Sequence, residues 1–260
     1  MLAARVLGVG LLGPGLADWG TGAAVLAGDT PYRSAPTVLP LPALLPAAER
    51  RRAGRVVRLA LAAGLEALAH SGSDARGLPS VFTSSGGDGD NCHEICQTLA
   101  GPERLISPTR FHNSVHNAAA GYWGIAQHCM QPSTALCAYD ASFGAGLLEA
   151  LAQLAEGAGP ILLVSYDLDY PAPLQALRPI PDALAIALVL GRPESGGGAL
   201  LGVRLADEAA TALPDAMLEA LRVAIPAARG LPLLRALATG AAHCVLDYLP
   251  EARLHVQLQP

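Results

Sequence analysis

The sequence predicts an α/β protein with a largely buried sheet, and three observations lead to this prediction. Short apolar runs of strand length alternate along the chain with longer segments whose apolar residues recur at helical spacing. Hydrophobic residues make up 52% of the 260 residues, which is enough to bury a substantial core. Charged residues make up only 15%, and this low share excludes a disordered chain.

The first part of the chain begins with a buried strand over residues 5–12, which ends in a Gly-Pro-Gly turn. A short helix over 17–27 follows and is closed by a Gly-Asp pair. The prolines concentrated around residues 32–45 predict an extended loop. Apolar residues at helical spacing then predict one long helix over 47–70.

The middle of the chain continues with a strand over 78–84 that leads into a Ser/Gly/Asp turn cluster at 85–90. A helix is expected over 92–100 and a turn over 106–111. A helix rich in alanine and glycine is expected over 115–129.

The next segments alternate again between the two periodicities. A strand over 132–139 precedes a helix over 142–156, and two further strands are expected over 160–165 and 183–190. This alternation favours a sheet that is covered by helices.

The composition changes after Arg192, where Ser-Gly-Gly-Gly at 195–198 is typical of a linker or a hairpin tip. We therefore expect a first domain over residues 1–192 and a C-terminal segment over 193–260 that packs on the same core. The elements expected in this segment are strands over 199–205 and 253–258 and helices over 215–225 and 231–239.

Charge and hydropathy exclude several classes of function. The net charge is −5 and no concentrated basic face is visible, so we expect no nucleic-acid partner. No apolar run reaches the roughly twenty residues of a membrane span, so no membrane partner is expected. Glycines and Pro14 break the first apolar run, which favours a buried strand over a signal peptide. An odd count of five cysteines fits small core residues in a reducing cytoplasm.

Two familiar motifs occur here without the context that their chemistry requires. Gly8-Val-Gly10-Leu-Leu-Gly13 has the spelling of a dinucleotide fingerprint, but Pro14-Gly15 follows where a helix should begin, so a structural turn is favoured. His112 and His116 lie one helical turn apart without an evident third ligand, so we expect no metal. We also expect no other cofactor.

The segment 134–150 predicts a strand, an elbow and a helix, and many acyl-transfer enzymes place their nucleophile at such an elbow. The elbow residue is Asp140, a poor acyl carrier and a good helix cap. Ser142 and Cys137 are the alternative nucleophiles. The pattern favours Ser142 as a residue of the first helical turn and Cys137 as a buried core cysteine inside the strand.

Several short motifs in order resemble the N-terminal half of β-ketoacyl synthases, which have a layered, thiolase-like α/β fold. They are the glycine-rich first strand and turn, Ser85-Gly-Gly87, Ser107-Pro-Thr-Arg-Phe111, the stretch 113–121, the elbow and helix of 135–157, and the strand 161–165. The resemblance covers roughly residues 5–192 and implies a reduced C-terminal part.

The resemblance implies that Asp140 stands where the family carries its acyl-accepting cysteine. The two histidines of the family's C-terminal half have no counterpart after Arg192. Such losses resemble the chain-length-factor partners of type II ketosynthases, and the short form resembles those of aryl polyene pathways. A non-catalytic cytoplasmic subunit is therefore implied. It would pair with an active β-ketoacyl synthase and meet an acyl carrier protein through that complex, in biosynthesis of the fatty-acid or polyketide type.

In the family, the strand before the elbow pairs with its counterpart across the dimer axis, so residues 133–139 are expected to form an edge strand. Bulky side chains near it would set where the partner's acyl tunnel ends. The candidates for this tunnel end and interface are Tyr122, Trp123, Tyr139, Asp140, Phe143, Asn113, His116 and Asn117.

Ordinary core packing is the alternative for the aromatic residues. Two other functions also stay open: an acyltransferase or condensing enzyme that uses Cys137 or Ser142, and a binding module for acyl carrier protein.

Overall fold

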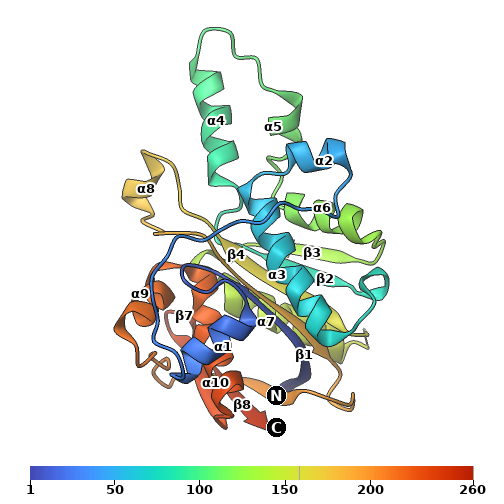
Figure 1. The fold of residues 1–260 in the computed structure, drawn as a ribbon, viewed down its shortest axis with the longest axis vertical. Helices are drawn as coiled ribbons and strands as arrows, with labels where there is room; N and C mark the ends of the chain where they lie inside the picture. The colour runs from blue at the N-terminus through green and yellow to red at the C-terminus, as the bar shows by residue number, and fades with distance from the viewer. Residues whose placement is uncertain (158, 260) are drawn as a thin grey trace.

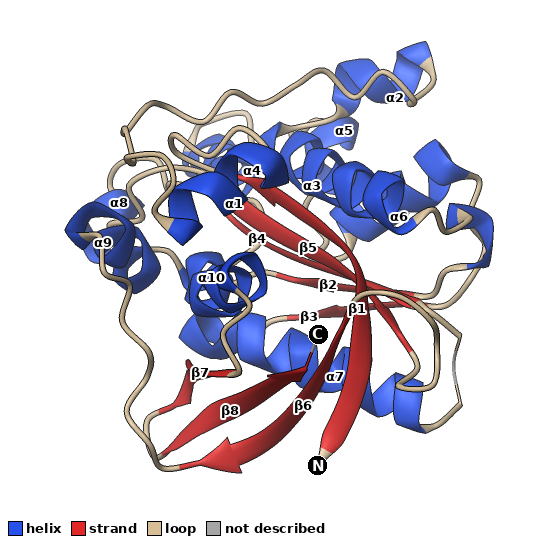
Figure 2. Cartoon of the chain, turned by 60° about the horizontal axis from the view of Figure 1, so that its bottom comes forward, coloured by secondary structure: helices blue, strands red, loops and turns tan. Residues whose placement is uncertain are grey.

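The computed structural model describes residues 1–157 and 159–259, and its centre is one mixed eight-stranded sheet (Figure 2). The strand order is β3-β2-β4-β5-β1-β6-β8-β7. β2 runs parallel to β3 and β4, and the other neighbouring pairs are antiparallel. The strands are β1 (Leu2–Leu12), β2 (Ser80–Thr83), β3 (Ser133–Leu136), β4 (Ile161–Asp167), β5 (Leu184–Gly191), β6 (Ala199–Ala206), β7 (His243–Leu249) and β8 (Ala252–Gln259).

Helices cover both faces of this sheet, which confirms the predicted α/β class. α3 and α6 pack on one face, and α7 and α10 pack on the other (Figures 1 and 2). The helices are α1 (Trp19–Ala27), α2 (Ala47–Arg52), α3 (Arg55–Ser71), α4 (Gly89–Ala100), α5 (Pro108–His112), α6 (Ala118–Gln127), α7 (Ser142–Ala155), α8 (Leu174–Leu177), α9 (Ala216–Ala224) and α10 (Leu231–Thr239). Short 3₁₀ turns are η1 (Ala75–Gly77), η2 (Tyr139–Ala141) and η3 (Pro226–Gly230).

The central strands are buried on both faces because their sequences are continuous apolar runs. Every residue of β4 and β5 is buried. Alternate side chains of β5 enter the two separate hydrophobic clusters on opposite sides of the sheet. The predicted strands at 160–165 and 183–190 therefore lie close to where the sequence placed them.

Two predicted elements differ from the structure, and one strand was not predicted. The long helix over 47–70 is two helices, because the chain leaves helical geometry at Ala53 and Gly54. The expected turn at 106–111 contains a short helix, α5, with Pro108 in its first turn. The strand β7 was not predicted, since polar residues such as Asp247 interrupt its apolar run.

The C-terminal segment continues the sheet of the preceding residues. β6 pairs with β1, β8 pairs with β6, and β7 forms the far edge. Side chains from α7 and from this segment share one hydrophobic cluster. η3 lies against α7, which brings the C-terminal segment close to the elbow.

A helical arm formed by α4 and α5 projects from the body of the molecule (Figure 1). Asn91 is the buried residue of α4, and α5 has none. Leu99 and Leu105 are exposed on the arm. The arm therefore presents apolar side chains that no element of the described chain covers.

The glycines of β1 serve close packing between the strand and α3. A Cβ atom on Gly8 would lie 2.1 Å from the carbonyl oxygen of Ala67, and one on Gly10 would lie 2.0 Å from that of Ala63. The chain then turns back at an isolated bridge between Gly13 and Leu16. The fingerprint-like glycines thus form a structural strand and turn, as predicted.

We expect Gly10→Ala to lower the free energy of unfolding by more than about 3 kcal/mol, because backbone atoms of α3 must move to admit the methyl group. Gly121→Ala is the matched control, since no atom lies within 4 Å of a Cβ at this helical position. The free energy of unfolding of the control should rise by up to about 1 kcal/mol, because alanine has the higher helix propensity. Urea unfolding of both variants checks the pair, and a neutral Gly10→Ala would contradict the packing argument.

Candidate functional site

The candidate site lies where three parallel strands end. β3, β2 and β4 are neighbours in the sheet, so the residues after their carboxyl ends meet at one edge. Such edges of α/β sheets are common binding sites. Here they supply the Ser84–Ser85 pair after β2, the elbow after β3, and Asp167 at the end of β4.

The elbow is a tight turn that Ser142 fastens. Tyr139 has a φ of +52°, an uncommon conformation for a side chain of its size. The Ser142 hydroxyl donates to the Tyr139 carbonyl at 2.7 Å and accepts from the Ala138 amide at 3.0 Å. Ser142 is fully buried as the first residue of α7, which confirms its predicted place in the helix.

Asp140 is held by two arginines from distant parts of the chain. Its carboxylate pairs with Arg178, from the segment before β5, and with Arg229 of η3 at 3.3 Å. The Arg178 guanidinium also lies 3.9 Å from the centre of the Tyr139 ring. Both carboxylate oxygens of Asp140 thus have cationic partners within this chain.

The expectation that Asp140 caps α7 was wrong. η2 intervenes between the strand and the helix, so the N-cap position belongs to Ala141, which offers no side-chain hydrogen bond. The carboxylate instead faces the two guanidinium groups. Position 140 of the elbow therefore carries an ion-paired carboxylate.

Asp167 is the buried anchor beneath the elbow. Its carboxylate accepts hydrogen bonds from the Ser85 amide at 2.8 Å, the Ser85 hydroxyl at 2.6 Å and the Ala227 amide at 2.8 Å. Burial raises the pKa of Asp167 to about 6, against the opposing effect of these hydrogen bonds. This single side chain joins the ends of β2 and β4 to η3.

The expectation of a buried Cys137 was also wrong. β3 ends at Leu136, so Cys137 lies in the exposed turn, where its thiol donates to the Ser85 carbonyl at 3.1 Å. Within residues 1–157 and 159–259, no histidine hydrogen-bonds to Cys137 or Ser142. Of the five cysteines, all of which the structure describes, only Cys244 is buried.

The four aromatic candidates do not form one cluster within this chain. Phe143 is buried on the α7 face of the sheet, and Trp123 is buried on the α6 face, where its ring lies 6.3 Å from that of Phe82. Tyr122 is buried beside Trp123, whereas Tyr139 is exposed at the elbow. Core packing therefore accounts for Phe143 and Trp123 in the isolated chain.

The polar candidates lie at the start of α6. Asn113 accepts a hydrogen bond from the Tyr122 hydroxyl at 3.1 Å and donates to the Arg52 carbonyl at 2.9 Å. The His116 side chain has its Nε2 atom enclosed without a hydrogen-bond partner. Asn117 occupies the N-cap position of α6 but makes no side-chain cap.

An open apolar groove follows the outer face of α6, and the sequence interpretation missed it. Two adjoining cavities of about 540 and 810 Å³ share Asn117, Gly121 and Ile125, and the larger one reaches Ser133 of β3. The groove is also lined by the exposed side chains of Phe111, Val115 and Met130. The signal in the sequence was the pair Gly121 and Gly124, which leaves open space on this helix face beside Asn117 and Ile125.

A second cavity of about 430 Å³ lies beside the elbow. Residues 138–141 form one wall, and Arg229 with the β7–β8 turn forms the other.

In the described part of the chain, no group of three or more His, Cys, Asp or Glu side chains is arranged to hold a metal ion. No helix among the described residues is long and apolar enough to cross a membrane.

Comparison with known proteins identifies the family. The model of the β-ketoacyl synthase N-terminal domain matches residues 27–247, so the chain belongs to the β-ketoacyl synthase family. No curated protein matches it.

Solved structures share the fold over nearly the whole chain. A chain of the complex of the ketosynthase ApeO with its chain length factor ApeC, from Xenorhabdus doucetiae, is similar with a TM-score of 0.76 and 24% identity, covering 99% of this chain and 100% of that one. The ishigamide ketosynthase/chain length factor gives a TM-score of 0.73, 14% identity and 99% coverage of both chains. The type II polyketide synthase complex AntDE:AntF gives a TM-score of 0.73 and 12% identity. The match covers 98% of this chain and 99% of that one. These likenesses establish the thiolase-like ketosynthase fold.

We expect Asp167 to give the fold a pH-dependent stability. Because its folded pKa of about 6 lies above the unfolded value, the native state binds more protons than the unfolded state in this interval, and the contribution of Asp167 falls as the pH rises from about 4 to 6. Asp167→Asn removes this titration. The destabilisation of the variant relative to the wild type should therefore be larger at pH 4.5 than at pH 7.

Chemical unfolding at the two pH values measures this difference, and Asp29→Asn at an exposed site is the control. If the destabilisation of Asp167→Asn relative to the wild type were equal at both pH values, the buried carboxyl would not titrate in this range.

Proposed function

We propose that this chain is a non-catalytic ketosynthase-like subunit, a chain-length factor, that pairs with an active β-ketoacyl synthase in the cytoplasm. The observation that carries the proposal is the elbow: the position that resembles the family's nucleophile holds Asp140, neutralised by Arg178 and Arg229. A carboxylate in this state is a poor acyl acceptor. The chain then contributes by shaping the acyl tunnel of its partner, and the partner receives the acyl groups from a carrier protein.

The free edge of β3 supports pairing. The carbonyls of Pro132 and Leu136 accept from Ser80 and Ser84 on the β2 side. Because hydrogen-bonding direction alternates along a strand, the backbone groups of Ser133 and Ala135 face away from β2. An unpaired edge of this kind favours addition of a partner strand.

The apolar groove on α6 supports the second part of the proposal, the control of chain length. It begins beside β3, so a subunit paired along this edge would also cover Phe111, Val115 and Ile125. A growing acyl chain that reached the interface would meet these apolar side chains and Tyr122, which also lines the groove. A polyene product, as in aryl polyene pathways, is apolar and suits an apolar groove that a partner subunit covers.

Ala135→Pro tests the pairing. It removes an amide hydrogen that faces away from β2, so the sheet keeps its internal bonds while the edge loses a donor. With an active β-ketoacyl synthase as the partner, the variant should form the complex at least about tenfold more weakly, by size-exclusion chromatography and titration calorimetry. Ala135→Val is the control and should pair normally. Equal affinity for all three proteins would rule out pairing along β3.

Phe111→Ala tests the chain-length role. Removal of this exposed ring enlarges the groove, so the reconstituted complex should release longer products, whereas Val115→Trp should shorten them. Leu177→Ala, on the exposed α8 away from the groove, is the control. Mass spectrometry of the products gives the measurement. A product distribution that none of these substitutions changes would remove the groove from the proposal.

A further inference from the structure

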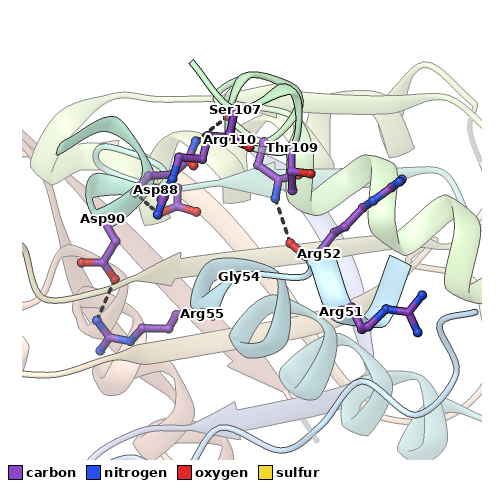
Figure 3. Close-up of a pocket in the computed structure, with 11 residues that line it drawn as sticks. Arg51, Arg52, Gly54, Arg55, Asp88, Asp90, Ser107, Thr109 and Arg110 are labelled. Carbon is purple, nitrogen blue, oxygen red and sulfur yellow. Dashed lines mark hydrogen bonds and ion pairs between the residues drawn. The ribbon is translucent and has the colours of Figure 1, made fainter. Parts of the chain in front are cut away.

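A charged pocket lies at the base of the helical arm, away from the elbow. It has a volume of about 410 Å³ and is lined by residues of α2, α3, α4 and α5 and of the turns beside them (Figure 3). Its lining residues are polar or charged except for a glycine: Arg51, Arg52, Gly54, Arg55, Asp88, Asp90, Asn91, Ser107, Thr109, Arg110 and Asn113.

Two buried asparagines fix the walls of this pocket. The Asn113 side-chain amide donates to the Arg52 carbonyl at 2.9 Å, and the Asn91 side-chain amide donates to the Arg110 carbonyl at 2.8 Å. Asn91 is 7% exposed and Asn113 is 8% exposed. The backbone segments that carry Arg52 and Arg110 are therefore held in place on two sides of the cavity.

The acidic side chains of the pocket are already engaged. Asp88 caps α4 by accepting a hydrogen bond from the backbone N–H of Asn91 at 2.9 Å. Asp90 pairs with Arg55 at 3.0 Å, and Arg55 also pairs with Asp169. Figure 3 shows Asp88, Asp90 and Arg55 on one side of the pocket and Arg51 and Arg52 on the other.

The remaining donors are free or weakly held. Within residues 1–157 and 159–259, no hydrogen bond or ion pair engages the side chains of Arg51, Ser107 or Thr109. Arg52 pairs with Glu49 at 3.2 Å and Arg110 pairs with Glu94 at 3.1 Å, both at exposed positions. Exposed pairs of this kind are weak, so a bound anion can replace them.

We propose that this pocket binds a phosphoryl group. Guanidinium and hydroxyl donors line this one cavity, and together they can donate to the several acceptor oxygens of a phosphate, which has more acceptor oxygens than a carboxylate. The ligand is a phosphate monoester or a phosphodiester. The pocket does not depend on the proposed function, because its donors all belong to this chain and none lies at the elbow or the α6 groove.

The test is titration calorimetry of the full chain with inorganic phosphate at constant ionic strength. Saturable binding is expected, and Arg51→Ala/Arg52→Ala should weaken it at least about tenfold through loss of charge-assisted hydrogen bonds. Arg50→Ala is the matched control, since Arg50 is exposed on the same helix but does not line the pocket. α2 has no buried residue, so these variants keep the fold.

Phenyl phosphate and dimethyl phosphate distinguish the two sources, because tighter binding of the first assigns a monoester and of the second a diester. Thr109→Val, which keeps the arginines, should also weaken phosphate binding. Absence of saturable binding, wild-type affinity in Arg51→Ala/Arg52→Ala, an equal loss in Arg50→Ala, or acetate that binds as tightly as phosphate would each overturn the proposal.

Discussion

The buried carboxylate of Asp167 is the interaction on which the arrangement of the elbow depends. It accepts hydrogen bonds from the turn after β2 and from η3, and so fixes the C-terminal segment against the ends of the parallel strands. Two residues after Ala227, Arg229 reaches Asp140 at the elbow. Because Asp140 is also held by Arg178, the turn after β3 is fixed by ionic contacts from two distant segments.

This arrangement separates the elbow from the surfaces that remain open. The elbow carboxylate is satisfied inside the chain, whereas the edge of β3 and the adjacent groove on α6 are not covered by any described residue. The proposed pairing with a ketosynthase depends on these two uncovered surfaces. The arginine pocket at the base of the arm adds a separate polar surface, which is organised by buried amides.

The sequence predicted much of the fold because the central strands are uninterrupted apolar runs, and it located the elbow because a small-residue helix begins a few residues after β3. It could not supply the partners of Asp140, since Arg178 and Arg229 lie 38 and 89 residues away along the chain. Cys137 was misplaced because strand ends are poorly marked in an apolar run. The arginine pocket was missed because its walls come from helices that only the fold brings together.

The most direct test of a non-catalytic role is intact-mass spectrometry of the complex with an active ketosynthase after incubation with acyl-loaded carrier protein. The account predicts that the acyl group appears on the ketosynthase and that the mass of this chain is unchanged. An acyl adduct on this chain that disappears in Cys137→Ala would contradict the account, because the exposed thiol after β3 would then be the acyl acceptor.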